Sequence, residues 1–105
     1  MQNLRPCVLR PRLRPTAQQR PPCWPYYTEA ADLHGLPPRV ISLNELDPLR
    51  DEGVAYYRKL MQAGVAATSR TVNGTCHAAA ELFRKACPDI YRSTTCDIRR
   101  FADSL

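Results

Sequence analysis

The sequence has no long apolar segment, and this absence argues against a membrane or secreted protein. No stretch approaches the roughly 18 consecutive apolar residues of a membrane-spanning helix, so we expect no membrane span. No apolar run of about 7–15 residues follows the first charges, as a secretory signal peptide requires. The arginine-rich start is free of acid like a mitochondrial transit peptide, yet its prolines would break the amphipathic helix of such a peptide. We therefore expect a cytoplasmic protein.

The chain also lacks a cysteine framework. Its five cysteines are odd in number, irregularly spaced and free of any Cys-x-x-Cys pair, unlike those of a disulfide scaffold or a zinc knuckle. The three cysteines and one histidine between residues 76 and 96 could be imagined as metal ligands, but their spacing matches no common zinc pattern. We therefore predict reduced, mostly buried thiols and no metal site.

Acidic residues are missing from the first 22 positions, which hold five arginines and five prolines. Because the other ten basic residues are matched by ten acidic ones, the whole net charge of +5 belongs to this segment. We predict residues 1–22 as a disordered tail and residues 23–105 as the folded part, which is small for a parallel α/β sheet. A basic patch on a folded surface would indicate a nucleic-acid partner, but a basic tail broken by prolines is much weaker evidence for one. We expect no nucleic-acid partner.

From residue 36 onward, apolar periodicity and turn signals alternate in an α/β order. Two runs rich in apolar or β-branched residues predict strands, and a run with apolar residues at helical spacing lies between them, which makes the strands parallel. Asp47 and Pro48 are typical of a helix start, and Gly64 of a helix end. The last helix carries an apolar stripe with little inside this chain to bury it. The predicted elements are strands at residues 39–44 and 65–72 and helices at residues 49–63, 78–86 and 89–104.

Asp47 and His77 are the residues best placed to carry chemistry. Asp47 follows the first predicted strand and His77 the second, and parallel strands about 4.8 Å apart bring their carboxyl ends to one edge. An acid and a histidine that meet there could form the orienting pair of a hydrolase triad. The plainer alternatives are Asp47 as a helix cap only and His77 as a structural histidine. We predict His34 as an exposed loop residue, and we disfavour Cys76 as a nucleophile because adjacent side chains on a turn seldom reach attack geometry.

Residues 44–53 (NELDPLRDEG) follow a Leu-Pro-Pro run at residues 36–38 and precede a Gly74-x-x-His77 turn. This pattern resembles the acid-bearing segment of the hormone-sensitive-lipase family of α/β-hydrolases, most of all its brefeldin A esterase branch, over about residues 24–105. The resemblance implies a partial α/β-hydrolase fold from the C-terminal edge of a parallel sheet, with Asp47 as the triad acid and His77 as the general base. It also implies hydrolysis of a small-molecule carboxylic ester through a serine acyl-enzyme, without cofactor or metal.

The nucleophile is the main departure from the family pattern. In the family, a G-x-S-x-G elbow and an H-G-G-G oxyanion loop precede the acid. All four serines here lack the flanking glycines of the elbow, and the sequence has no H-G-G-G run. Ala78-Ala79 also stand where many relatives have Gly-Phe. We therefore expect the C-terminal fragment of a serine esterase, inactive alone and able to self-associate through an exposed sheet edge. The alternative is a small non-enzymatic interaction module whose basic tail binds acidic partners or RNA.

Overall fold

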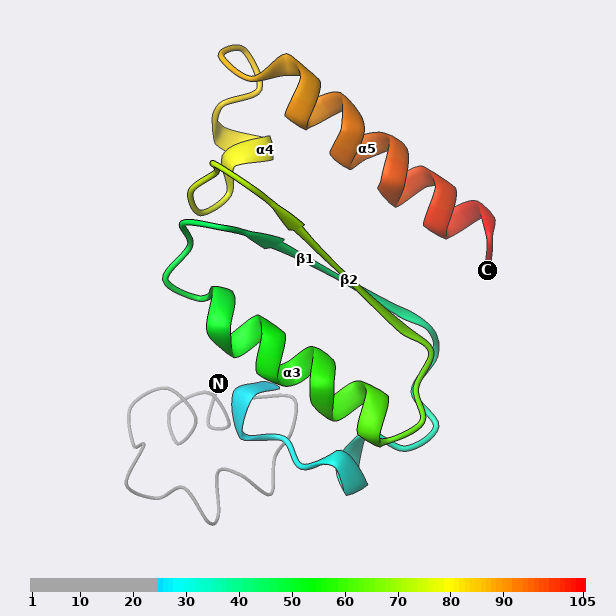
Figure 1. The fold of residues 1–105 in the computed structure, drawn as a ribbon. Coiled ribbons are helices and arrows are strands. Elements are labelled where there is room, and N and C mark those ends of the chain that lie inside the picture. The colour runs from blue at the N-terminus through cyan, green and yellow to red at the C-terminus, as the bar shows by residue number, and fades with distance from the viewer. Residues whose placement is uncertain (1–24) are drawn as a thin grey trace, which may run out of the picture.

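The structure, a computed structural model, describes residues 25–105, in which a two-stranded parallel sheet has helices on both of its faces (Figure 1). The predicted tail, residues 1–22, lies outside the described residues. The predicted order of strand, helix, strand, helix and helix is confirmed. In chain order the elements are η3 (Pro25–Tyr27), η4 (Ala30–Leu33), β1 (Arg39–Asn44), α3 (Arg50–Gln62), β2 (Ala67–Val72), α4 (Ala79–Leu82) and α5 (Pro88–Asp103).

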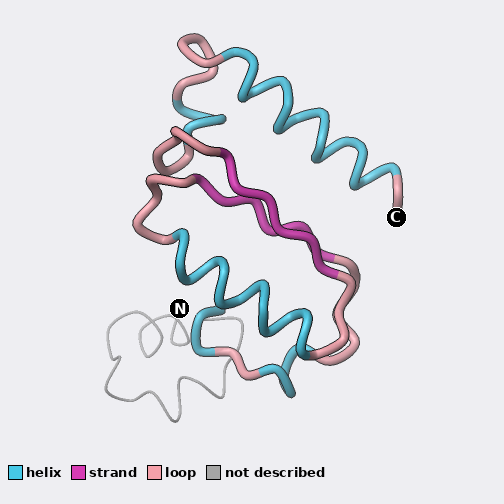
Figure 2. Tube along the Cα trace, viewed as in Figure 1, coloured by secondary structure: helices cyan, strands magenta, loops and turns pink. Residues whose placement is uncertain are grey.

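The two strands run parallel, with Arg39 opposite Ala67 at one end and Asn44 opposite Val72 at the other. The connection between them passes through α3, because parallel strands need a crossover that a tight turn cannot supply. Both strands therefore end at the same edge of the sheet. The turns that follow them lie close together there, at the end where α4 begins (Figure 2).

The hydrophobic core lies on the face of the sheet that α3 covers. Successive strand residues point to opposite faces, and Ile41 and Leu43 of β1 point toward α3. Gly53 of α3 lies so close to the strand that an added Cβ would collide with Leu43 Cδ2. A side chain at position 53 would therefore force the Leu43 side chain to move. The buried members of the core cluster are Leu33, Leu60, Ala63 and Val65.

α3 starts within one residue of the prediction, but Asp47 and Pro48 do not have the predicted roles. Asp47 and Pro48 precede the helix instead of capping and opening it, and Leu49 is the residue at its N-terminal boundary. The Asp47 side chain accepts the backbone N–H of Leu49 at 2.8 Å, which closes a turn two residues ahead of the carboxylate. Short acidic side chains favour this local turn, and the helix can begin only after it.

The end of α3 agrees with the prediction. Gly64 has a φ of +76°, which an L side chain rarely adopts. The N–H of Val65 bonds the carbonyl of Leu60 at 3.0 Å, and the N–H of Gly64 bonds that of Met61 at 3.0 Å. These two bonds form a Schellman motif, which satisfies the last carbonyls of the helix and turns the chain toward β2.

α4 is much shorter than the helix predicted over residues 78–86. The helix covers four residues, and the backbone leaves helical geometry at Phe83, where φ is −112° and ψ is 26°. Residues 84–86 form a turn instead, and Cys87 is kept out of the helical region because the ring of Pro88 restricts the residue before it. The prediction was wrong because residues 83–87 must form the turn that leads into α5, and their favourable helix propensity is too small to prevent it.

α5 begins at Pro88, within one residue of the prediction, and lies on the face of the sheet opposite α3 (Figure 1). Within this helix, which lies wholly in the described part of the chain, no residue is buried. Ile98 remains 63% exposed, which agrees with the expectation that the apolar stripe has little to pack against. Arg70 of β2 links the helix to the sheet through an ion pair with Asp97 and a 3.4 Å hydrogen bond to Thr94.

The cysteines within residues 25–105 are free thiols, as predicted, but they are not mostly buried. Cys76 and Cys96 are exposed and Cys87 is partly exposed. Their positions in a turn and on the uncovered α5 explain why the expectation of burial was wrong. The other two cysteines, Cys7 and Cys23, lie outside the described residues.

None of the helices in residues 25–105 is long and apolar enough to cross a bilayer.

Candidate active site

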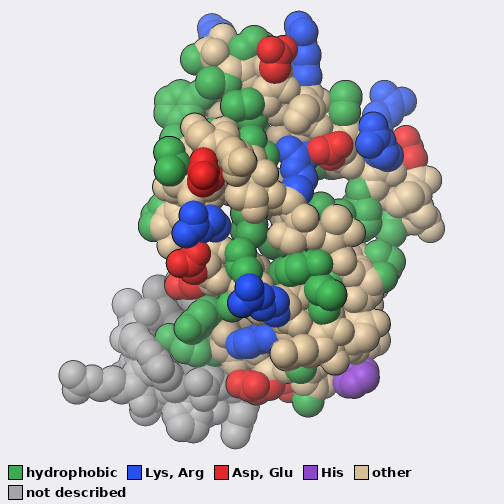
Figure 3. All heavy atoms as spheres, viewed as in Figure 1, with side chains coloured by type: hydrophobic (Ala, Val, Ile, Leu, Met, Phe, Trp, Pro, Cys, Tyr) green, Lys and Arg blue, Asp and Glu red, His purple; other side chains and the backbone are tan. Residues whose placement is uncertain are grey.

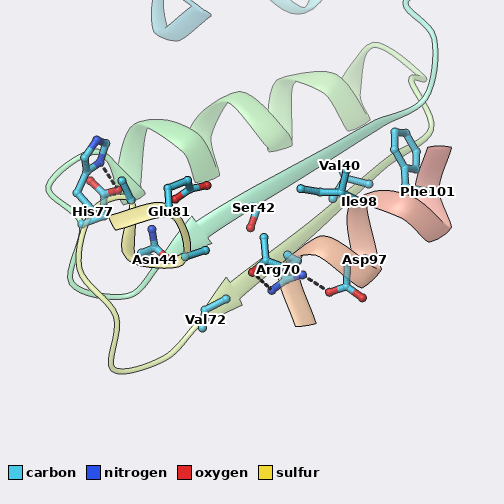
Figure 4. Close-up of a pocket in the computed structure, with 14 residues that line it drawn as sticks. Val40, Ser42, Asn44, Arg70, Val72, His77, Glu81, Asp97, Ile98 and Phe101 are labelled. Atoms are coloured by element: carbon cyan, nitrogen blue, oxygen red, sulfur yellow. Dashed lines mark hydrogen bonds and ion pairs between the residues drawn. The ribbon is translucent and has the colours of Figure 1, made fainter. Parts of the chain in front are cut away.

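The candidate site lies at the edge of the sheet where both strands end. Asp47 is in the turn between β1 and α3, and His77 is in the turn between β2 and α4. His77 Nδ1 lies 2.7 Å from Asp47 Oδ2, although the residues are thirty positions apart in the chain (Figure 4). The predicted geometry, an acid and a histidine on loops at the same end of two adjacent parallel strands, is confirmed.

The two oxygens of the Asp47 carboxylate have different partners. Oδ2 contacts the His77 ring, and Oδ1 accepts the backbone N–H of Leu49. The carboxylate therefore closes the turn before α3 and contacts the histidine at the same time. Because one oxygen is anchored at the entrance of α3, the other is held in a fixed direction toward the histidine.

The pKa of the Asp47 carboxyl is lowered from its ordinary value, first by the hydrogen bond from the Leu49 backbone N–H. Partial burial opposes this effect, and the hydrogen bond and charge of His77 add to the lowering. The carboxyl is therefore ionised at neutral pH. An ionised carboxylate only accepts hydrogen bonds, so the neutral His77 ring must donate from Nδ1, which leaves Nε2 as the unprotonated nitrogen.

The two partners differ in their access to solvent. The Asp47 side chain is 11% exposed, whereas the His77 side chain is 61% exposed. Nε2 of a ring so exposed is open to another group, and an imidazole with a free Nε2 and an acid behind Nδ1 can accept a proton and return it.

A hollow of about 450 Å³ borders this pair on the α5 side of the sheet. His77, Ala78 and Glu81 line one end of it, and Asp97 and Phe101 of α5 line the other (Figure 4). The space-filling view shows the molecule hollowed beside α5 (Figure 3). The hollow lies between the sheet and α5.

Comparison with known proteins places the chain in a family. A family model described as the alpha/beta hydrolase fold matches residues 6–81. The chain belongs to the α/β-hydrolase fold family. The match begins inside the segment predicted as a tail, whose structure lies outside the described residues.

Solved structures of esterases share this part of the hydrolase fold. Brefeldin A esterase, described as a bacterial homologue of human hormone-sensitive lipase, is 44% identical with a TM-score of 0.78, covering 86% of this chain and 26% of that one. Esterase Est22 is 42% identical with a TM-score of 0.80, covering 88% of this chain and 26% of that one. The predicted partial α/β-hydrolase fold and the predicted likeness to the hormone-sensitive-lipase family are confirmed.

A curated relative agrees with these structures. An arylesterase of Saccharolobus solfataricus is 49% identical over 49 residues, which is 47% of this chain and 16% of that protein. The chain thus spans about a quarter of the length of the solved relatives and less of the curated one.

Ala78, next to the candidate histidine, is the non-glycine residue with a positive φ among residues 25–105, at 54°. The left-handed region costs an L-residue roughly 1–2 kcal/mol because Cβ crowds the following carbonyl. The strained backbone explains why glycine would suit the turn.

The other candidate residues do not join the pair. His34 is exposed in a turn, as predicted. Among the hydrogen bonds of residues 25–105, none links His77 to a serine or to Cys76. In the same residues, no three histidine, cysteine or acidic side chains are placed to bind a metal ion together.

Sequence reasoning missed Thr75, which joins the two turns of the site. Thr75 is 4% exposed, and its hydroxyl lies 2.9 Å from Asn44 Oδ1 and 2.6 Å from the carbonyl of Val72. Its own carbonyl accepts the N–H of Leu46 at 2.9 Å. No local signal could have shown this role, because a threonine after an Asn-Gly turn is ordinarily exposed.

Proposed function

We propose that this chain supplies the acid and the histidine of a serine esterase triad, with Asp47 as the acid and His77 as the general base. The 2.7 Å contact between Asp47 Oδ2 and His77 Nδ1 carries the proposal. The ester hydrolases among the similar proteins support the reaction class, since brefeldin A esterase and the arylesterase are named for it. The substrate of the parent protein is then a small-molecule carboxylic ester.

In this mechanism, His77 Nε2 takes the proton of a serine hydroxyl as that oxygen attacks the ester carbonyl. The same nitrogen then passes the proton to the leaving alcohol, and the acyl-enzyme is hydrolysed by water in a second round. Asp47 keeps the ring in the Nδ1–H tautomer and stabilises the imidazolium that forms. The nucleophile and the oxyanion donors come from elsewhere in the parent protein, and the cytoplasm is its proposed location.

A chimera tests this proposal directly. Residues 25–105 replace the matching segment of brefeldin A esterase, to which they are 44% identical. We expect the chimera to hydrolyse a short-chain p-nitrophenyl ester. Asp47→Asn should lower kcat roughly 10⁴-fold, because the ring is no longer kept in the reactive tautomer, and His77→Ala should lower it at least as much.

His34→Ala is the matched control, because it removes the other histidine of the described region from an exposed turn and should leave kcat unchanged. A folded chimera without activity would contradict the proposal. So would a chimera whose activity survives His77→Ala.

The chain by itself should show no esterase activity above background on the same esters. Removing a nucleophile leaves only binding and oxyanion effects, and the sequence has no recognisable oxyanion loop either. Turnover by the purified chain that disappears on His77→Ala would show that a nucleophile is present within it. Cys76 would then be the first residue to test.

A further inference from the structure

Glu45 connects the turn that carries Asp47 to the turn that carries His77. Its Oε2 accepts the backbone N–H of Gly74 at 2.6 Å, across a separation of twenty-nine residues. Glu45 lies two positions before Asp47, and Gly74 three positions before His77. The two side-chain contacts therefore run between the same two turns, which lie close together beyond the ends of β1 and β2 (Figure 2).

The main chain of Glu45 is anchored on both sides. Its N–H donates to the carbonyl of Val72 at 3.1 Å, and its carbonyl accepts the guanidinium of Arg50 at 2.9 Å. The backbone at this position is thus tied to β2 and to α3. The carboxylate is the part of the residue that reaches across to the histidine turn.

Gly74 is the point in that turn where the chain has most freedom. Its φ is +71°, and glycine populates several backbone regions at little cost. The bond from Leu46 N–H to the Thr75 carbonyl restrains the chain after Gly74 but leaves the preceding peptide plane able to rotate. The Glu45 carboxylate restrains this plane, and a hydrogen bond to an ionised acceptor is stronger than one to a neutral acceptor.

The contact between Asp47 and His77 is poorly suited to order the turn by itself. The His77 ring is 61% exposed, so water competes for its Nδ1–H, and holding an exposed side chain in one orientation costs conformational freedom. The ring keeps its position toward Asp47 only if the backbone below it is already in place. The hydrogen bonds that Gly74 and Thr75 make to Glu45 and Leu46 supply that backbone order.

We propose that Glu45 is a positioning residue for the Asp47–His77 pair, acting through the N–H of Gly74. It fixes the histidine turn so that Nδ1 faces Asp47 and Nε2 faces outward. Its importance for ester hydrolysis rests on the proposed function, but its effect on the ring does not require turnover.

The tautomer of His77 reports this effect. Nitrogen NMR of the full chain distinguishes Nδ1–H from Nε2–H at a pH of about 9, above the ordinary histidine pKa of about 6.5. We expect His77 to be mainly Nδ1–H in the wild type. In Glu45→Ala the contact to Asp47 should be lost for much of the time, and Nε2–H should become the major form. His34, exposed in a separate turn, is an internal reference that should stay constant.

Two conservative variants separate the contact from the charge. Glu45→Gln keeps an oxygen that can accept the Gly74 N–H, so it should retain the wild-type tautomer. Glu45→Asp keeps the charge but is one methylene shorter, so it should behave like Glu45→Ala. Glu52→Ala is the matched control, because it removes the same charge from the first turn of α3 and should leave the ring unchanged.

The outcomes distinguish this proposal from the proposed function. A wild-type ring that is not mainly Nδ1–H contradicts the Asp47–His77 pair itself. A ring that changes in Asp47→Asn but not in Glu45→Ala overturns the role of Glu45 alone. If Glu45→Ala does not fold, the variants Glu45→Gln and Glu45→Asp decide the question. A wild-type tautomer that is retained in Glu45→Asp but lost in Glu45→Gln overturns the role of the Gly74 contact.

The esterase chimera provides a second readout. Glu45→Ala should lower kcat roughly tenfold to a hundredfold with little change in KM, because a misplaced base affects the chemical step more than substrate binding. Glu45→Gln should restore kcat to within a few-fold of the parent chimera. Equal losses in the two variants, or a loss confined to KM, would overturn the positioning role.

Discussion

At Asp47 a single carboxylate interacts with both a helix entrance and a histidine, and the two contacts differ in strength. The backbone N–H of Leu49 is the largest cause of the lowered pKa, and the His77 ring comes after it. The local turn is therefore the main reason that the pKa of Asp47 is lowered. Ionisation in turn determines which His77 nitrogen carries the proton.

Replacing Asp47 should change how stability depends on pH. Because the folded-state pKa is lowered, the carboxylate stabilises the fold fully above its ordinary value of about 3.9 and loses this effect as the pH falls through the folded pKa. Asp47→Asn should therefore be less stable than the wild type at neutral pH, and the difference should disappear in strong acid. Urea unfolding across this range measures it.

His77→Gln is the companion variant for that titration. It removes the ring but leaves the Leu49 N–H on the carboxylate, so most of the pH dependence should remain. If the dependence vanished with the ring, the histidine and not the backbone would be the main cause of the lowered pKa.

Ala78→Gly should stabilise the protein. Relief of the left-handed conformation is worth roughly 1–2 kcal/mol, and the greater freedom of glycine in the unfolded chain offsets part of it, so we expect a gain of up to about 1 kcal/mol. The urea midpoint should rise accordingly. Ala55→Gly, at a partly buried position in the middle of α3, should instead cost about 1 kcal/mol. Destabilisation by both changes would show that the turn does not require a left-handed residue.

At the scale of the elements, α3 and α5 are attached to the sheet in different ways. α3 buries Leu60 completely, whereas α5 buries no residue and contacts β2 through the Arg70 side chain. The Arg70–Asp97 pair is partly exposed, and such pairs are usually weak. We therefore expect the two helices to differ in how readily they open.

Arg70→Met should loosen α5 selectively. Methionine keeps much of the apolar stem but removes both polar links, to Asp97 and to Thr94. Hydrogen exchange should accelerate across α5 and remain unchanged in α3 and the strands. Arg99→Met provides the control, since its pair with Asp103 lies within the helix and is largely exposed. Equal acceleration in the two variants would show that Arg70 does not anchor the helix.

At the scale of the whole molecule, the described chain has few buried residues for its length. The core cluster contains four buried residues. Each of the two strands has a neighbouring strand on one side only. Open edges leave backbone N–H and C=O groups ready to pair with another chain. The apolar stripe of α5 and the hollow beneath it add further uncovered surface.

The isolated chain should therefore be marginally folded, self-associating or prone to aggregate. Ordering each residue costs roughly 1–2 kcal/mol of conformational free energy, and a core this small offsets it poorly. Thermal unfolding combined with size-exclusion chromatography measures both properties. A sharp cooperative transition from a clean monomer would show that residues 25–105 form an independent domain and would contradict the fragment hypothesis.

Local patterns in the sequence were sufficient to predict the two strands, the end of α3 and the start of α5. Apolar runs, Gly64 and Pro88 act on their own neighbours, so their effect does not depend on the rest of the fold. The meeting of Asp47 with His77 also followed from the sequence, because a strand–helix–strand unit brings the ends of both strands to one edge.

Only the tertiary structure determined the contacts that surround this pair. The bonds from Glu45 to Gly74 and from Asn44 to Thr75 join residues about thirty positions apart. The burial of Thr75 follows from how the two turns pack against each other. These features depend on the register of β1 and β2, and a shift of one residue would point every strand side chain to the other face. Register is a property of the paired strands, so neither segment carries it alone.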